Sequence, residues 1–180
     1  MKIGILRVGK APANVLERLW ENLNMAFPDL ECQLVSDVLA LSDQAFDKSR
    51  GQYRSDIILG FVKDYAYKTE AFSRVLGVVD VDVYVPGLNF VFGEAECPGK
   101  AAIISLWRLR PEFYGKTPNL EVFVERATKE AVHELGHTFG LAHCTNPFCV
   151  MYFSNSIFET DRKKSLFCNK CYSKVQISVR

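Results

Sequence analysis

The feature that most constrains this chain is the segment HELGHTFGLAH at residues 133–143, which contains every histidine of the protein. His133 and His137 are four residues apart, so on an α-helix both imidazoles stand on one face and can reach the same cation. Histidines placed for unrelated reasons would rarely all fall in so short a segment. The pattern therefore predicts a helix with a metal ion beside it.

A third ligand is expected after this helix ends. Gly140 occupies the next position on the same helix face, and glycine readily adopts the left-handed conformation that ends a helix and turns the chain. The turn would return His143 toward His133 and His137. Three protein ligands leave one position of a tetrahedral zinc ion open for water, which is typical of catalytic zinc.

Glu134 lies beside the two helical histidines and need not bind the metal. Zinc held by three protein groups lowers the pKa of its water to about 7 and polarises a substrate carbonyl. The Glu134 carboxylate could accept a proton from the zinc-bound water and pass it to the leaving amine. These residues predict a zinc-dependent metallopeptidase that hydrolyses peptide bonds.

Two pairs of cysteines follow the histidines: Cys144 with Cys149, and Cys168 with Cys171. This spacing suits a tetrahedral zinc held by four thiolates, and such a closed coordination sphere is structural. Two alternatives remain. Cys168 and Cys171 could form a redox dithiol, although the surrounding β-α-β context of such motifs is missing. A finger of two cysteines and two histidines would dismantle the three-histidine site.

The motifs together resemble the archaemetzincin (archaelysin) family of metzincin zinc metallopeptidases. The resemblance is carried by HELGHTFGLAHC, by the CVM at 149–151 and by the CxxC at 168–171, and it extends upstream to about residue 75 through LGVVDVDVYVPGLNFVFGEA and SLWRLRPEFYG. It implies Glu134 as general base and acid, and two zinc ions per chain. The implied catalytic zinc ligands are His133, His137 and His143, and the implied structural zinc ligands are Cys144, Cys149, Cys168 and Cys171.

The same resemblance implies a zincin-like α/β (α+β) fold. Its parts are a twisted, mixed sheet with an antiparallel edge strand, a long active-site helix, a Met-turn and the C-terminal four-cysteine zinc site. Met151 is the methionine expected in the turn. Some metzincins place a tyrosine two residues after this methionine to assist the oxyanion, but here that residue is Phe153 and Tyr152 is one position away. Oxyanion stabilisation is therefore expected either to come from elsewhere or to be weak.

Hydrophobic periodicity and turn residues predict the secondary structure. We expect one peptidase domain over residues 1–180, with 144–180 as a C-terminal subdomain carrying the structural zinc. The predicted strands are 2–8, 32–39 and three between 75 and 110, and the predicted helices are 12–26, 55–66 and 118–140.

The segment NFVFGEA at 89–95 is the candidate edge strand, because Pro86-Gly87 and Gly93 bound its aromatic run. An extended peptide can pair with a free edge through main-chain hydrogen bonds, which makes Phe90, Val91 and Phe92 candidate substrate-binding residues. A core strand is an equally good interpretation. The alternating Asp80 and Asp82 upstream are interpreted as a solvated strand face.

Composition limits the partners and the compartment. The formal net charge is +1 and no apolar run approaches the ~20 residues that span a bilayer, so neither a membrane nor a nucleic acid is an expected partner. No signal peptide is apparent, which predicts a cytoplasmic protein whose clustered cysteines bind metal. A peptide substrate and a monomeric state are expected. Cys32 and Cys97 stand apart and are predicted to be buried free thiols.

A different class of function must be weighed against the peptidase. The chain could be a catalytically latent, metzincin-fold zinc-binding module that contacts protein or nucleic acid through its four-cysteine region. Between residues 161 and 180 there are six basic residues and one acid. Four thiolates on Zn²⁺ carry a net charge of about −2, however, which offsets much of this excess. The sequence therefore favours the peptidase.

Overall fold

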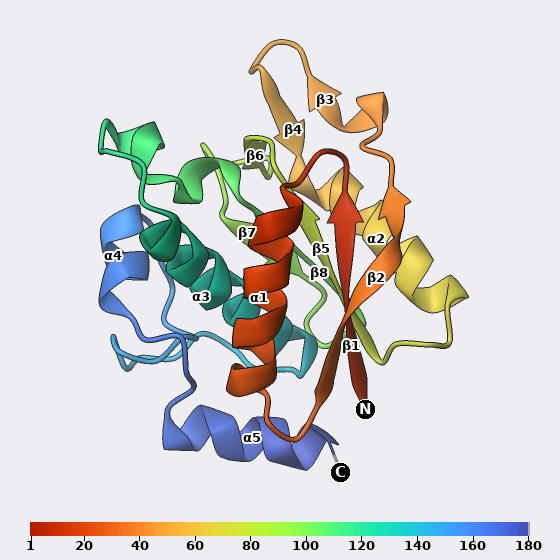
Figure 1. The fold of residues 1–180 in the computed structure, drawn as a ribbon, viewed down its shortest axis with the longest axis vertical. Helices are drawn as coiled ribbons and strands as arrows, with labels where there is room; N and C mark the ends of the chain where they lie inside the picture. The colour runs from red at the N-terminus through yellow and green to blue at the C-terminus, as the bar shows by residue number, and fades with distance from the viewer. Residues whose placement is uncertain (180) are drawn as a thin grey trace.

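A five-stranded mixed sheet organises the molecule in the computed structural model, which describes residues 1–179. The strand order is β2-β1-β5-β8-β7; the first four strands run parallel, and β7 is antiparallel to β8 at one edge (Figure 1). This arrangement confirms the predicted mixed sheet. The strands are β1 (Lys2–Val8), β2 (Glu31–Leu39), β5 (Arg74–Val79), β7 (Gly93–Ala95) and β8 (Ala101–Ser105).

Helices cover both faces of this sheet (Figure 1). α1 (Ala13–Ala26) and α3 (Leu120–Thr138) pack together on one face, and α2 (Ser55–Lys68) covers the other. α1 buries an apolar stripe that includes Val15, Leu19 and Leu23, as its helical spacing predicts. Two hydrophobic clusters result, one on each side of the sheet, and the cluster on the α1 side includes buried apolar residues of α3.

The first of the three strands predicted between residues 75 and 110 is interrupted. β5 ends at Val79, and Val83–Tyr84 (β6) joins β3 (Phe46–Asp47) and β4 (Gln52–Arg54) in a second sheet. Between them, Asp80 pairs with Arg110 and Asp82 pairs with Arg108. The two carboxylates are therefore not a solvated strand face, because partly buried ion pairs hold them in a turn.

The motif helix α3 is shorter than the predicted range of 118–140. The Asn119 side chain accepts a hydrogen bond from the Val122 N–H at 3.1 Å, so the cap lies after the Thr117-Pro118 pair. The helix ends at Thr138, and Gly140 then adopts a φ of 83°. The left-handed glycine required by the sequence interpretation is therefore present.

The region after the motif contains two helices that the sequence analysis did not predict. α4 (Ile157–Arg162) begins with a capping box between Ser156 and Glu159, and α5 (Asn169–Val179) lies at the base of the fold (Figure 1). No helix within residues 1–179 has the length and apolar character needed to cross a membrane. Short 3-10 helices cover Asp43–Ala45, Trp107–Leu109 and Pro111–Tyr114.

Candidate metal centres and active-site cleft

Helix α3 holds two of the histidines with their Nε2 atoms together. The Nε2 atoms of His133 and His137 are 3.1 Å apart. Nδ1 of His133 lies 2.8 Å from the Val150 carbonyl oxygen, and Nδ1 of His137 lies 2.7 Å from that of Leu141. Because a carbonyl can only accept, each Nδ1 carries the proton and each Nε2 has a free lone pair.

The turn at Gly140 brings the third histidine to the same place. The Gly140 N–H donates to the His137 carbonyl at 2.8 Å, and the His143 ring then lies 4.9 Å from His137 and 5.3 Å from His133, measured between ring centroids. One ligand atom from each histidine lies within 4.8 Å of the others. Phe153 packs on the outer side of His143, with centroids 4.8 Å apart.

The protonation states of these imidazoles suit a metal. Burial lowers the pKa of His133 well below its usual value, and the neighbouring Lys163 ammonium acts in the same direction. The same two causes lower the pKa of His143, and burial lowers that of His137. All three rings are therefore neutral near pH 7. Zinc–nitrogen bonds of about 2.0–2.1 Å place tetrahedral ligand atoms about 3.4 Å apart, so the donor set fits zinc.

Met151 lies directly beneath the motif helix and is fully buried. The Tyr152 N–H donates to the Cys149 carbonyl, which closes a tight turn, and the Cys144 N–H donates to the Met151 carbonyl. A Cβ at Gly136 would lie 2.4 Å from the Met151 sulfur. The motif glycine is thus required for the methionine to approach the helix this closely.

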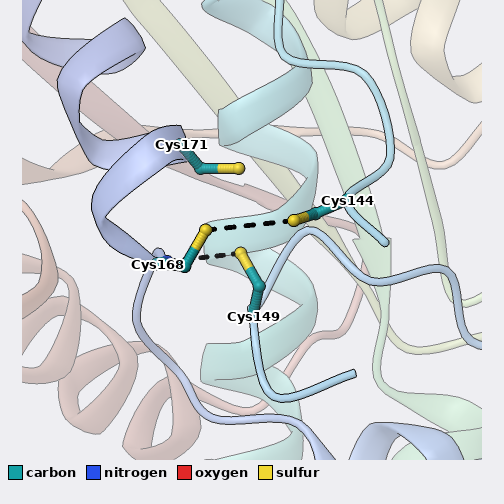
Figure 2. Close-up of side chains that lie close together, drawn as sticks. All are labelled: Cys144, Cys149, Cys168 and Cys171. Carbon is teal, nitrogen blue, oxygen red and sulfur yellow. Dashed lines mark hydrogen bonds between the residues drawn. The ribbon is translucent and has the colours of Figure 1, made fainter. Parts of the chain in front are cut away.

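The four cysteines form a separate cluster from the histidines (Figure 2). Their sulfur atoms all lie within 4.8 Å of one another, and those of Cys144 and Cys168 are 3.9 Å apart. Zinc–sulfur bonds of about 2.3 Å give a tetrahedral edge of about 3.8 Å, which matches. Cys168 immediately precedes α5 and Cys171 lies in its first turn, so half of the cluster comes from the start of this helix and the residue before it.

The environment of the sulfur atoms also suits a metal. Burial raises the pKa of Cys149 and Cys171. For Cys168, burial acts to raise the pKa, but hydrogen bonds from the Cys171 N–H and from neighbouring thiols outweigh it and lower the pKa to about 7. A bound zinc would replace these thiol protons, because thiolates are its ligands. Because the three histidines and the four cysteines form separate clusters, a zinc finger built from two cysteines and two histidines is excluded.

Glu134 lies at the floor of a cleft of about 250 Å³, next to the edge strand. A Cβ at Gly93 of β7 would lie 2.6 Å from Glu134 Cγ, so strand and carboxylate are in direct contact. Burial raises the pKa of Glu134 well above its usual value, and the nearby Glu130 carboxylate adds to this effect. Glu134 and His133, one of the three clustered histidines, therefore line the same cavity.

The edge strand is shorter than predicted, since β7 covers 93–95 and not 89–95. Phe90, Val91 and Phe92 precede it and line the cleft. Phe92 is buried in the core while the other two are partly buried, so the segment serves both the core and the cleft wall. Just before this segment, side chains of other elements donate hydrogen bonds to the carbonyl groups of Leu88 and Asn89.

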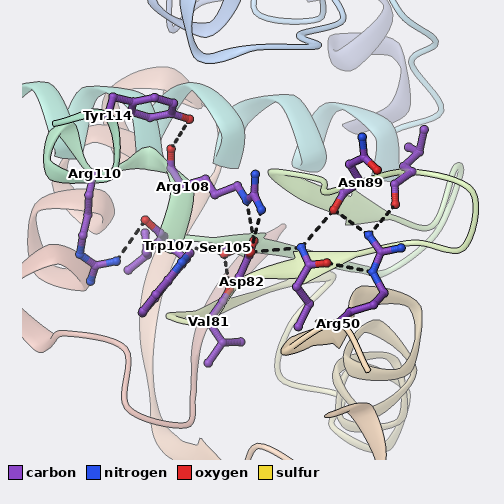
Figure 3. Close-up of polar contacts among 12 residues, drawn as sticks. Arg50, Val81, Asp82, Asn89, Ser105, Trp107, Arg108, Arg110 and Tyr114 are labelled. Atoms are coloured by element: carbon purple, nitrogen blue, oxygen red, sulfur yellow. Dashed lines mark hydrogen bonds and ion pairs between the residues drawn. The ribbon is translucent and has the colours of Figure 1, made fainter. Parts of the chain in front are cut away.

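Those side chains belong to a polar network behind the cleft wall (Figure 3). Arg50 donates to the carbonyl oxygens of Leu88 and Asn89 at 3.2 and 3.0 Å, and Gln52 donates to that of Asn89 at 3.0 Å and to Asp82 at 3.1 Å. Arg108, which pairs with Asp82, also lies over the Phe90 ring at 4.4 Å. This network fixes the wall of the cleft.

The remaining cysteines differ from one another. Cys32 is a buried free thiol, as predicted, and burial raises its pKa to about 12. Cys97 is free but exposed, which corrects the prediction. It lies in the turn between β7 and β8, where its sulfur donates a weak hydrogen bond to the Leu141 carbonyl at 3.6 Å. Arg180, one of the six basic C-terminal residues, lies outside the described residues.

Comparisons with known proteins assign the fold and the chemistry. Residues 32–177 match the model of peptidase family M54. The archaemetzincin of Pyrococcus abyssi is 46% identical over 175 residues, covering 96% of this chain and 93% of that protein, and the archaemetzincin of Methanocaldococcus jannaschii is 45% identical over 176 residues, covering 98% and 93%. The sequence interpretation as an archaemetzincin is confirmed.

Solved structures of archaemetzincins have the same fold as this chain. The archaemetzincin crystal structure from Methanopyrus kandleri superposes with a TM-score of 0.84 at 37% identity, over 99% of this chain and 95% of that chain. The one from Archaeoglobus fulgidus gives 0.81 at 39% identity, over 97% and 99%. These relatives do not favour a latent binding module. The chain therefore belongs to peptidase family M54, the archaemetzincins, and is a zinc metallopeptidase.

Proposed function

We propose that this chain cleaves peptide bonds with one zinc ion on His133, His137 and His143 and with Glu134 as its general base and acid. The observation that carries the proposal is the arrangement of three neutral imidazoles around one point with a carboxylate beside them in a cleft. Bound zinc would polarise the scissile carbonyl and lower the pKa of a water molecule to about 7.

The protein's own groups supply the remaining requirements. The backbone carbonyls of Val150 and Leu141 fix the tautomers of His133 and His137 and keep both Nε2 atoms pointed at the metal position. Glu134 accepts the proton of the attacking water and delivers it to the leaving amine. The raised pKa of Glu134 makes its carboxylate a stronger base, which favours acceptance of the water proton.

The substrate would lie along the edge strand. β7 is the last strand of the sheet and contacts Glu134 directly, so an extended peptide paired with β7 would pass over the carboxylate. Phe90, Val91 and Phe92 would then contact substrate side chains as part of the cleft wall. Phe153 packs on His143 and has no hydroxyl group that could donate a hydrogen bond to the oxyanion. Oxyanion stabilisation is therefore assigned to the metal in this proposal.

A second zinc ion, on Cys144, Cys149, Cys168 and Cys171, would be structural. It would join the chain after the motif to α5 and hold residues 144–180 as a C-terminal subdomain. The peptide bond between His143 and Cys144 links the two metals. The structural zinc would therefore help to hold His143, the third ligand of the catalytic zinc, in position.

A peptide-library cleavage assay tests the proposed role of Glu134. The zinc-loaded wild type should cleave peptides, and the Glu134→Gln protein should lose about 10²- to 10⁴-fold in kcat while keeping its zinc, because glutamine cannot accept a proton. Glu125→Gln on the exposed side of the same helix serves as the matched control. Undiminished turnover in Glu134→Gln would remove Glu134 from the mechanism.

A further inference from the structure

The cleft extends past the proposed catalytic glutamate to a second buried carboxylate. Its floor is formed by Glu130, His133 and Glu134 of α3, one wall by residues 88–93, and the other by residues 153–155. Glu130 precedes Glu134 by four residues, so the two side chains stand on the same helix face. Only 3% of Glu130 is exposed, although no zinc or catalytic step described above uses this residue.

One oxygen of Glu130 accepts a hydrogen bond from Thr160 and forms an ion pair with Lys163, both from the region of α4. The Thr160 hydroxyl donates to Oε1 at 3.0 Å, and the Lys163 ammonium lies 3.1 Å from the same atom. Thr160 and the Lys163 side chain are fully buried. A buried charge requires such a partner, and Lys163 compensates Glu130 from behind the cleft. The carboxylate is therefore fixed in position.

Two polar groups lining the cleft are left for a ligand. Within residues 1–179, Oε2 of Glu130 accepts no hydrogen bond from the protein. The Ser154 hydroxyl, on the wall at 153–155, is shielded from solvent and also has no hydrogen-bond partner in that range. A buried polar group without a partner costs about 1–3 kcal/mol, so a ligand that pairs with the Ser154 hydroxyl would gain that free energy.

We propose that this cavity is a specificity subsite for a cationic side chain, arginine or lysine, next to the scissile bond. The proposal rests on the proposed peptidase function. Glu130 Oε2, which accepts no hydrogen bond from the described residues, would repel an acidic side chain. A guanidinium or ammonium would donate to Glu130 Oε2 and Ser154 Oγ, while its aliphatic stem packs along Phe90 and Phe92. The cleft volume of about 250 Å³ accommodates such a side chain.

The test separates recognition from catalysis by measuring peptide affinity in the zinc-loaded Glu134→Gln protein. Peptides that differ at one position are compared: arginine against citrulline, which has the same shape without the charge, and lysine against norleucine. We expect the arginine and lysine peptides to bind about 10-fold more tightly or better. This arm needs no substitution at Glu130, so a folding defect cannot affect it.

The second arm adds Glu130→Gln, which keeps an acceptor for Thr160 and Lys163. The preference for arginine over citrulline should fall to about 2-fold or less, while Glu125→Gln should leave it unchanged. Thermal unfolding and zinc content establish that each variant is folded and loaded. In the wild type, kcat/KM for cleavage should show the same preference.

Equal affinity for arginine and citrulline, or a preference for apolar side chains, would overturn the proposed subsite even if peptides are cleaved. A preference that survives Glu130→Gln would assign the recognition to other residues and would also overturn it. If the wild type cleaved no peptide but still bound arginine over citrulline, the proposed catalytic mechanism would fail while the subsite would stand.

Discussion

The two ligand clusters are adjacent in sequence and opposite in construction. The histidine cluster stands on a rigid helix, opens to a cleft, and ends at His143, which is exposed. The cysteine cluster joins a loop to the start of α5, and two of its residues, Cys149 and Cys171, are buried. His143 and Cys144, neighbours in the chain, belong to different clusters.

This difference explains how one short segment can serve two metals. A catalytic ion needs an accessible coordination position, whereas a structural ion needs all four positions filled by protein. Neighbouring side chains in an extended segment point in different directions, so His143 and Cys144 can face different metals. The predictions below separate the two clusters by their effects on folding and on activity.

The largest effect is expected on folding when the cysteine cluster is broken. Cys149→Ser should lose the second zinc and destabilise the fold, because the metal closes the chain around α5. A loss of about 3 kcal/mol would lower Tm by roughly 6–12 °C. Cys97→Ser, at an exposed cysteine outside the cluster, should change Tm little. Equal melting of Cys149→Ser and wild type would show that the second site is not structural.

A chelator should remove zinc from the histidine cluster before it removes zinc from the cysteine cluster. A chelator such as dipicolinate should remove the zinc of the open histidine cluster first, abolishing peptide cleavage while Tm changes little. The buried cysteine cluster should release its zinc only under harsher treatment, with unfolding. Simultaneous loss of activity and of structure at the lowest effective chelator concentration would contradict this order.

A smaller effect concerns the contact between the motif helix and Met151. Gly136→Ala should destabilise the protein by about 1–3 kcal/mol, because the new Cβ would lie 2.4 Å from the methionine sulfur. Gly60→Ala, in α2, meets nothing within 4 Å and should stabilise by about 0.5–1 kcal/mol. Denaturant unfolding of both variants measures the contrast. Stabilisation by Gly136→Ala would refute the close packing.

The smallest effect is chemical and concerns the two unclustered cysteines. Burial raises the pKa of Cys32 to about 12, so about one thiol in 10⁴ is ionised at pH 8. In the zinc-loaded protein, iodoacetamide should therefore modify the exposed Cys97 and leave Cys32 unmodified until the protein unfolds. Peptide mass mapping reads out both sites. Rapid modification of Cys32 in the folded protein would contradict its burial.

Much of the motif region could be predicted from sequence because its geometry is local. The spacing of His133 and His137 determines a shared helix face, and Gly140 determines the turn. The four-cysteine spacing likewise predicts one cluster, and the structure brings these sulfur atoms together. The family resemblance supplied the mixed sheet and its antiparallel edge, which local patterns alone do not determine.

Features that depend on distant contacts could not be predicted. Asp80 and Asp82 alternate with valines as in a strand, but Arg110 and Arg108, far along the chain, draw them into a turn. Helical spacing could have placed Glu130 on the face of Glu134. Nothing local indicates that Lys163 is its partner, because that contact depends on how α4 packs against α3.

Counting zinc by native mass spectrometry tests the central division of ligands most directly. Wild type should hold two zinc ions per chain, and His137→Ala should keep one and remain folded. Cys149→Ser should lose its own zinc and bind the other more weakly, because Cys144 anchors His143. One zinc in wild type, or loss of both from His137→Ala, would contradict two sites built from three histidines and four cysteines.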